Sequence, residues 1–349
     1  MSKRIVIMAG GTGGHVFPAL AVAHHLQEQH WQVSWIGTHK GMESRVIPAN
    51  KIEIDWLSVN GLRGKGFVAL LKMPWMLLKA SVEAGKILHQ RKPDVVLGMG
   101  GFVAGPGGLM AKVLGIPLVI HEQNRVPGTT NRLLSRIANK VLQAFPESFT
   151  SDRQALFTGN PLRKQFLQIN EVTEAQTDNL KILVMGGSLG AQRLNELVPE
   201  ALALVDNITV QHQTGAAMQQ QVAAVYKTKA IDALALDFIE DVVAAYRWAD
   251  LVICRAGAMT ISEVAAMGLP SILVPYPYAI DDHQTANAHY LVDAGAGILI
   301  CQPQLTAGLL AEKIKYCRLN KESMAVAAKQ CAKLDATESV AEQCSLEAR

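Results

Sequence analysis

The stretch IVIMAGGTGGHVFPALAVAHHL, residues 5–26, decides the fold class of this 349-residue chain. A short apolar run is followed by four glycines between Gly10 and Gly14, then by His15 and a helix-like pattern of apolar residues. A glycine turn between a strand and a helix exposes backbone N–H groups at the helix N-terminus, where a phosphate or another oxygen-rich group can bind. A tight turn without a ligand would look the same, so one loop leaves both interpretations open.

The second half of the chain repeats this plan. In ILVMGGSLGA, residues 182–191, an apolar run again precedes paired glycines, a hydroxyl residue and another glycine. Short apolar runs alternate with longer helical patterns throughout, which is typical of parallel sheets joined by crossover helices. The sequence therefore predicts an α/β protein with two similar doubly wound domains, residues 1–162 and 163–329. The last helical segment could belong to either domain, and we assign residues from about 330 to 349 to the first.

Ten apolar runs are expected to form the strands of the two sheets. They are residues 4–8, 33–36, 94–97, 118–121 and 140–144 in the first half, and 181–185, 209–213, 251–254, 271–274 and 297–300 in the second.

Composition narrows the class of protein. Apolar residues make up 49% of the chain, and the net charge of +3 gives no case for a nucleic-acid partner. The five cysteines contain no Cys-x-x-Cys pair, which favours free thiols in a reducing compartment. No secretory leader is evident, and no apolar stretch approaches the ~18 residues of a membrane span. We expect a cytoplasmic protein without a spanning segment.

The glycine turns do not match the common nucleotide signatures. Val16 occupies the third glycine position of the dinucleotide pattern counted from Gly11, and no lysine follows the glycines as a P-loop requires. No Asp-x-Asp motif is present, and the histidines lack ligand spacing. We therefore expect neither a bound metal nor a cofactor.

Polar residues follow other expected strands. Glu263 lies in a helix expected to begin at about Thr260, where it could bind ribose hydroxyls or form a capping box with Thr260. Residues 281–284 follow another strand, at the edge where open α/β sheets bind ligands. In the first half, the glycine-rich residues 98–108 and the loop 121–128 occupy similar positions.

Seven motifs occur in order across almost the whole chain: GGTGGHVFPALAVA, GMGGFVAGPGG, HEQN, TGNPLR, GGSLGAQRLNE, AGAMTISE and DDHQTANA. This combination closely resembles the MurG family of bacterial glycosyltransferases. The resemblance implies the GT-B fold, with two Rossmann-like domains and a cleft between them. It also implies an inverting transfer of N-acetylglucosamine from UDP-GlcNAc to the 4-hydroxyl of the muramyl sugar of lipid I, undecaprenyl-diphosphate-MurNAc-pentapeptide. The product would be lipid II, for peptidoglycan synthesis.

The resemblance further implies a donor site. Ser188 would contact phosphate, Ile239 the uracil, and Glu263 the ribose hydroxyls. Gln284 would contact the N-acetylglucosamine, and Arg163 would reach the nucleotide. The other expected contacts come from the helix start of the second domain and from loops of the first domain that close over the sugar: Ala258, Met259, Thr260, Ile261 and Ser262, and Thr12, Gly13, Gly14 and Asn124.

Such a displacement needs a base for the acceptor hydroxyl and stabilisation of the departing UDP. His15 is our first candidate for the base, because a neutral imidazole can accept that proton near pH 7. His15 could instead only orient the loop or cap its helix, and Glu122 is the second candidate. Helix N-termini, loop N–H groups and Arg163 can offset the charge of the leaving group without a metal.

One segment is suited to a membrane surface. Residues 62–92 hold seven Lys or Arg side chains against one acid, and Pro74 is expected to break or kink the helix. An ordinary crossover helix would explain most of it, so we assign only residues 67–79 to an anionic bilayer, where each basic residue contributes about 1 kcal/mol. The expected contacts are Phe67, Leu70, Leu71, Lys72, Trp75, Met76 and Lys79. The enzyme would then be peripheral, on the cytoplasmic face of the bacterial plasma membrane.

Two rival functions remain open at this point. A UDP-GlcNAc 2-epimerase shares the fold and the donor but needs no lipid acceptor. A non-catalytic membrane adaptor would bind the UDP-sugar without turnover, and His15 would then be replaceable.

Overall fold

The computed structural model describes residues 2–58, 67–167, 179–187 and 190–349, without the side chains of residues 67–73. The chain divides into two compact units, Met1–Arg163 with Lys333–Arg349, and Lys164–Ala332. The boundaries expected from the sequence, after residue 162 and at about 330, lie within three residues of these. The acidic, polar residues 171–179 are expected from the sequence to link the two domains, and all of them except Asn179 lie outside the described residues.

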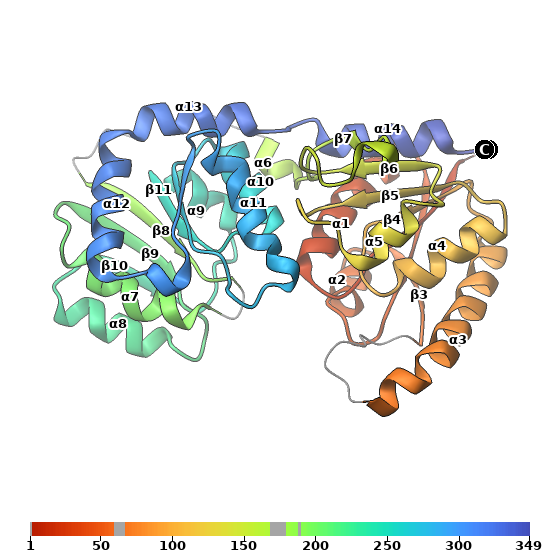
Figure 1. Ribbon diagram of the computed structural model, residues 1–349, viewed down its shortest axis with the longest axis horizontal. Helices are drawn as coiled ribbons and strands as arrows, with labels where there is room; N and C mark the ends of the chain where they lie inside the picture. The colour runs from red at the N-terminus through yellow and green to blue at the C-terminus, as the bar shows by residue number, and fades with distance from the viewer. Residues whose placement is uncertain (1, 59–66, 168–178, 188–189) are drawn as a thin grey trace. The chain divides into compact units, whose positions relative to one another are not determined.

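The first unit is built on a parallel sheet with the strand order β3-β2-β1-β4-β5-β6-β7. Its strands are β1 (Arg4–Met8), β2 (Gln32–Gly37), β3 (Glu53–Trp56), β4 (Val95–Gly98), β5 (Leu118–Glu122), β6 (Lys140–Gln143) and β7 (Leu156–Phe157). Its helices are α1 (Gly13–Glu28), α2 (Glu43–Ala49), α3 (Phe67–Arg91), α4 (Ala104–Val113), α5 (Thr129–Leu134) and the C-terminal α14 (Ala336–Glu347), as labelled in Figure 1. A 3-10 turn spans Ser151–Arg153.

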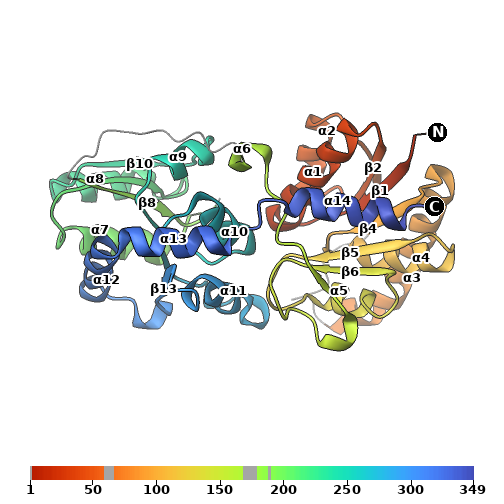
Figure 2. The same cartoon turned by 90° about the horizontal axis from the view of Figure 1, so that it is seen from above.

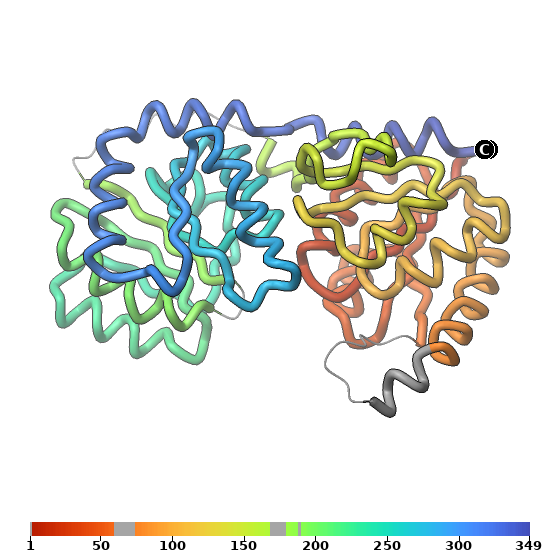
Figure 3. Tube along the Cα trace, viewed as in Figure 1, coloured from red at the N-terminus to blue at the C-terminus, as the bar shows by residue number. Residues whose placement is uncertain are grey.

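Both faces of this sheet are covered, which explains why its strands are continuous apolar runs. On β1, Ile5 and Ile7 pack with α1, α2 and α14, whereas Val6 and Met8 pack with α3 and α4. The last helix, blue in Figures 2 and 3, lies beside α1, the first and red helix of the chain. Its buried face, which includes Val340, completes that layer of the core.

The second unit repeats the arrangement with the order β10-β9-β8-β11-β12-β13. Its strands are β8 (Leu180–Met185), β9 (Ile208–Gln213), β10 (Ala233–Leu236), β11 (Leu251–Cys254), β12 (Ser271–Leu273) and β13 (Gly297–Leu299). Its helices are α6 (Lys164–Leu167), α7 (Gln192–Leu202), α8 (Gln219–Thr228), α9 (Val242–Trp248), α10 (Ala258–Met267), α11 (His283–Val292), α12 (Ala307–Leu319) and α13 (Lys321–Cys331), with 3-10 turns at Ile280–Asp282 and Gln302–Gln304.

Each of the two sheets has its own topological switch point, where the strand order reverses. The strand order reverses between β1 and β4 in the first sheet and between β8 and β11 in the second. In open α/β sheets, ligands bind beyond the carboxyl ends of the strands at such a reversal. The glycine turns that the sequence singles out follow β1 and β8, so each lies at the switch point of its own sheet.

All ten expected strands are present, with ends that differ by at most one residue. Three further strands, β3, β7 and β10, escaped the sequence analysis. Each lies at an edge of its sheet and is largely or partly exposed. The sequence of β3, EIDW, is not a continuous apolar run, β7 has only two residues, and half of β10, ALAL, is alanine, which is a weak strand former.

Two details of the helices differ from expectation. Pro74 was expected to break or kink its helix; α3 continues through Pro74, so the break is wrong, and the kink stays a prediction. Helix α10 begins at Ala258, two residues before the expected start at Thr260.

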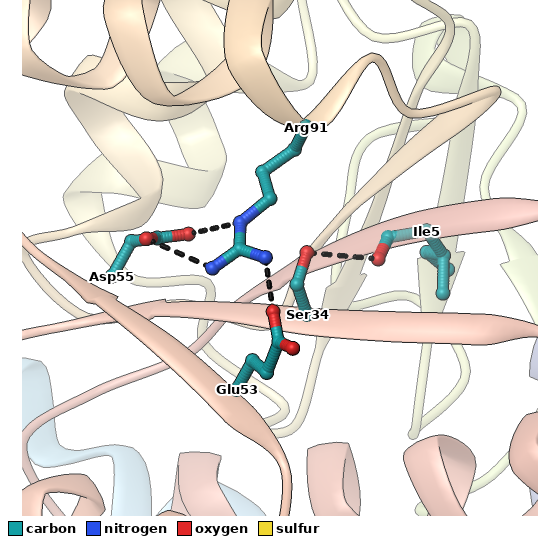
Figure 4. A network of polar contacts seen from close by, with 5 residues as sticks. All are labelled: Ile5, Ser34, Glu53, Asp55 and Arg91. Carbon is teal, nitrogen blue, oxygen red and sulfur yellow. Dashed lines mark hydrogen bonds and ion pairs between the residues drawn. The ribbon is translucent and has the colours of Figure 1, made fainter.

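The edge strand β3 is fastened by an arginine at the end of α3. The Arg91 guanidinium donates to Asp55 from Nε at 2.7 Å and also pairs with Glu53, as Figure 4 shows. These carboxylates raise the pKa of Arg91 above its usual range, mainly through the hydrogen bond to Asp55. Nearby, Ser34 Oγ donates to the carbonyl of Ile5 at 3.5 Å, near the amino ends of the strands. The network therefore lies near the amino ends of the strands, whereas the glycine turn lies at their carboxyl ends.

Candidate functional site

A cavity of about 670 Å³ opens at the carboxyl ends of β8, β11 and β12 in the second unit. Glycines of the turn after β8, polar side chains and two tyrosines line it. The lining residues are Met185, Gly186, Gly187, Gly190, Ala191, Gln192, Arg193, Glu196, Arg255, Gly257, Thr260, Tyr276, Tyr278, Gln284 and Gln302.

The glycines of this turn are required by its backbone. Gly187 and Gly190 have φ of +89° and +75°, which L side chains rarely adopt. A Cβ on Gly190 would lie 2.0 Å from the carbonyl oxygen of Thr214. The turn after β8 therefore packs directly on the backbone that follows β9, and leaves its other side facing the cavity.

A buried glutamine ties this turn to a second loop. Gln213 Nε2 donates to the carbonyl of Gly187 at 2.8 Å, and its Oε1 accepts from the Ile239 amide at 3.1 Å. Ile239 is the residue expected to meet the uracil. Gln213 was not predicted from the sequence, although its position at the carboxyl end of an expected strand was a usable signal.

Arg255 places a positive charge at the wall of the cavity. Its Nη1 donates to the carbonyls of Val274 and Pro275 at 3.0 Å each, and Nη2 donates to Gln302 Oε1 at 2.7 Å. Burial lowers the pKa of Arg255, yet an arginine stays charged. Its position directly after β11 was the signal that the sequence analysis did not use.

Two of the expected donor contacts line the cavity. Thr260 does so from α10. Gln284 does so from α11, with its Oε1 fixed by the Tyr276 amide at 2.8 Å.

The other residues of the expected run, from Ala258 to Glu263, are not part of the cavity lining. Ile261 is fully buried, Ala258 is nearly so, and Ser262 Oγ donates to the carbonyl of Ala258. Glu263 accepts from the Tyr246 hydroxyl at 3.2 Å. The capping box considered for Glu263 is not formed, because Gly257 rather than Thr260 is the N-cap. Ser188 lies outside the described residues.

The glycine turn of the first unit surrounds a carboxylate of the protein itself. Glu43 is fully buried; its Oε2 accepts from the Gly11 amide at 2.9 Å, and its Oε1 accepts from the amide and hydroxyl of Thr38 at 2.9 and 2.7 Å. A Cβ on Gly10 would lie 2.6 Å from Oε1, and one on Gly41 would lie 2.0 Å from Oε2. These glycines therefore make room for Glu43, and the amide of Gly11 is already occupied.

His15 lies in the first turn of α1, at the end of a chain of side chains. Its Nδ1 is 2.8 Å from Gln123 Oε1, and Gln123 Nε2 is 3.0 Å from His121 Nδ1. The Nε2 of His121 is 2.9 Å from the carbonyl of Gly159. Burial lowers the pKa of His121 to about 4. A Cβ on Gly100 would lie 2.9 Å from the His15 ring, so this glycine leaves space for the imidazole.

Glu122, the second candidate base, is engaged within its own loop. Its Oε1 accepts from the backbone and side-chain amides of Asn124 at 2.9 and 3.2 Å, and its Oε2 accepts from Gly128 N and Asn131 Nδ2 at 3.1 and 2.9 Å. A buried carboxylate with four donors is well suited to holding the loop, and it also fixes Asn124.

The sequence matches the glycosyltransferase family 28 N-terminal domain at residues 5–143 and the C-terminal domain of the same family at residues 181–344. The chain belongs to glycosyltransferase family 28.

Relatives with known names support this family assignment. A UDP-N-acetylglucosamine--N-acetylmuramyl-(pentapeptide) pyrophosphoryl-undecaprenol N-acetylglucosamine transferase from Methylococcus capsulatus is 57% identical and is aligned over 100% of this chain and 99% of its own length. The crystal structure of Acinetobacter baumannii MurG is 42% identical, with a TM-score of 0.85 over 99% of both chains. A putative UDP-N-acetylglucosamine 2-epimerase from Listeria monocytogenes reaches a TM-score of 0.67 over 99% and 97% of the two chains, but at 15% identity it shows the fold alone.

Four expected site residues of this family 28 enzyme lie on or beside α1 in the first unit. Thr12, Gly13 and Gly14 form the N-cap and first residues of α1. The Arg163 guanidinium lies 5.9 Å from the centre of the Phe17 ring, also on α1. Within the described residues, no group of three or more His, Cys, Asp or Glu side chains is arranged to hold a metal ion.

The expected membrane contacts lie on α3. The side chains of Phe67, Leu70, Leu71 and Lys72 lie outside the described residues. Trp75 is 75% exposed, Met76 is half-buried, and the exposed Lys79 pairs with Glu83 at 3.7 Å. None of the described helices has the length and apolar character needed to span a bilayer.

Proposed function

We propose that this protein transfers N-acetylglucosamine from UDP-N-acetylglucosamine to the 4-hydroxyl of the muramyl sugar of lipid I, with inversion, and so forms lipid II for peptidoglycan synthesis. The observation that carries this proposal is the 57% identity, over the full length, to a transferase named for that sugar donor and that lipid-linked muramyl acceptor. The match extends over 100% of this chain and 99% of the relative, so it includes both units.

The donor is bound in the second unit. The cavity after β8 offers glycine-turn backbone and the cationic Arg255, which together suit a diphosphate. Thr260 and Gln284 line the same cavity and provide hydrogen-bonding side chains for the sugar. Gln213 holds the Gly187 carbonyl and the Ile239 amide on one side chain, so the segment proposed for the uracil is fixed relative to the glycine turn.

The reaction is a single displacement at the anomeric carbon. His15 takes the proton of the acceptor hydroxyl as the new C1–O bond forms, and the bond from C1 to the diphosphate oxygen breaks to release UDP. We assign the base to His15 rather than Glu122, because Glu122 already accepts four hydrogen bonds in its loop. Backbone N–H groups and the Arg163 guanidinium stabilise the negative charge that develops on UDP.

The decisive experiment is transfer of radiolabelled N-acetylglucosamine to a lipid I analogue by the purified chain. We expect a labelled disaccharide lipid and stoichiometric UDP. Conversion of UDP-GlcNAc to UDP-N-acetylmannosamine without labelled lipid would instead indicate the epimerase, and tight UDP-GlcNAc binding without turnover would indicate the adaptor.

We also propose that the enzyme reaches its lipid acceptor as a peripheral protein on the cytoplasmic face of the plasma membrane. Trp75, Leu78 and Val82 are 75%, 56% and 50% exposed and follow one stripe of α3. Helix α4 packs beside α3 and exposes Leu109 and Val113 at 48% and 66%. Exposed apolar side chains on neighbouring helices, with lysines among them, suit an anionic bilayer surface.

Vesicle sedimentation tests this surface. With vesicles that contain anionic lipid, we expect Trp75→Ala with Leu78→Ala to lower the bound fraction several-fold. Leu319→Ala removes an apolar side chain that is 85% exposed on α12 and should leave binding unchanged. Charge reversal at Lys72 and Lys79 should also weaken binding, and unchanged binding in all these variants would reject the membrane proposal.

A further inference from the structure

The chain of contacts behind His15 begins at a group whose proton is fixed. His121 Nε2 faces the carbonyl of Gly159 at 2.9 Å, and a carbonyl can only accept, so Nε2 carries the proton. Burial lowers the pKa of His121 to about 4, so the ring is neutral near pH 7. A neutral imidazole carries one proton, and the Nδ1 of His121 is therefore an acceptor.

The orientation of the Gln123 side-chain amide follows from its neighbours. Its Nε2 lies 3.0 Å from the acceptor Nδ1 of His121 and 3.2 Å from the carbonyl oxygen of His121. Two acceptors on one side require the NH₂ group there, so Oε1 faces His15. The reversed amide would oppose two acceptors with a third and would lose both hydrogen bonds.

His15 must then donate from Nδ1, because Gln123 Oε1, 2.8 Å away, can only accept. In the neutral ring this leaves Nε2 with the free lone pair. Nothing among the described residues forms a hydrogen bond to His15 Nε2. The nitrogen that a general base needs is thus the one that remains available to a substrate.

We propose that Gln123 and His121 are positioning residues that hold His15 in the tautomer with its proton on Nδ1, so that Nε2 is the atom that deprotonates the acceptor hydroxyl. This inference rests on the proposed function only for the identity of that hydroxyl. The tautomer itself is a property of the free protein.

The same contact stabilises the product of the proton transfer. When Nε2 receives the proton of the 4-hydroxyl, the His15 ring becomes an imidazolium with a proton on each nitrogen. Gln123 Oε1 keeps accepting from Nδ1, and a hydrogen bond from a charged donor is stronger than one from a neutral donor. No atom of Gln123 or His121 has to move in this step.

Nitrogen NMR of the full chain labelled with ¹⁵N-histidine measures the tautomer directly. The His15→Gln variant identifies the His15 signals among the ten histidines. In the wild type near pH 7.5, we expect His15 Nδ1 to be protonated and Nε2 to give the signal of an unprotonated nitrogen. In Gln123→Met, which has a similar volume but no acceptor, we expect a mixture of tautomers.

Transfer kinetics supply the second readout. Loss of the tautomer in Gln123→Met should lower kcat about 100-fold while KM for each substrate stays within about twofold, since orienting partners of a catalytic histidine act on the chemical step. Ser148→Ala is the matched control. It removes a buried hydroxyl that donates to the Asn124 carbonyl at 3.1 Å in the same region, and it should leave the His15 tautomer unchanged.

The outcomes separate this inference from the proposed function. A proton on Nε2 of His15 in the wild type, or a Gln123→Met variant with an unchanged tautomer and kcat, would overturn the inference even if transfer is observed. An Nδ1-protonated His15 that shifts in Gln123→Met would uphold the positioning role even if the chain fails to glycosylate lipid I.

Discussion

The two glycine turns follow equivalent strands, β1 and β8, but their backbone amides meet different partners. In the first turn, the Gly11 amide donates to the buried carboxylate of Glu43. In the second turn, Gly187 and Gly190 face a cavity of about 670 Å³ that Arg255 also lines. One turn is filled by an anion of the protein, and the other is open to an anion from solution.

This difference indicates a division of labour between two copies of one motif. The hydrogen bond to the internal carboxylate holds the first turn in place just before α1, where His15 lies. A turn that remains open can bind a diphosphate. The repeat in the sequence therefore predicts a shared backbone, whereas the partner of each turn decides what the turn does.

The largest effect should come from placing a methyl group in each turn. Gly190→Ala should destabilise the protein by about 3 kcal/mol and abolish UDP binding, because its Cβ would overlap the Thr214 carbonyl in addition to the unfavourable positive φ. Gly11→Ala has a φ of +95° but open space around the added atom, so it should cost only about 1 to 2 kcal/mol. Urea unfolding and UDP titration measure both. Equal losses of UDP affinity in the two variants would contradict the comparison.

A smaller effect is expected from the internal anion. Glu43→Gln keeps the shape of the side chain but turns an NH₂ group toward backbone donors, so we expect about 1–3 kcal/mol of lost stability. UDP affinity should stay within about twofold, because Glu43 belongs to the first unit. Denaturant unfolding beside UDP calorimetry tests this. A large loss of UDP affinity with unchanged stability would show that the first turn binds the nucleotide.

The smallest expected effect is on the pH dependence of stability, to which one buried histidine in each unit contributes. Burial lowers the pKa of His121 to about 4 and that of His212 to about 3, below the value of about 6.5 for an unfolded histidine. The unfolded chain then binds more protons, so stability is complete above about pH 6.5 and falls as the pH drops toward 4. In His212→Phe this loss should be shallower than in the wild type. Parallel stability curves between pH 7.5 and 4.5 would contradict the assignment.

Sequence patterns predicted what depends on local order. Central strands were found because burial on both faces makes them apolar runs, while the half-exposed edge strands β3, β7 and β10 were missed. Both glycine turns and His15 were found for a similar reason, because a turn is determined by residues that are adjacent in the sequence.

The contacts that assign roles were not predictable in this way. His15 and Gln123 are 108 residues apart, and no periodicity connects them. The donors that engage Glu122, and the carboxylate inside the first turn, likewise become visible only when distant segments are folded together. The sequence therefore offered two candidate bases. The fold shows that Glu122 accepts four hydrogen bonds within its loop, whereas the His15 side chain has one hydrogen-bond partner among the described residues, Gln123.

The most direct test of this division of labour is the His15→Gln variant, measured for UDP-GlcNAc binding and for transfer to a lipid I analogue in one preparation. If the first turn holds the base and the second holds the donor, the Kd should stay within about twofold of the wild type while kcat falls by about 100-fold or more. Transfer at the wild-type rate, or donor binding lost together with transfer, would contradict the account.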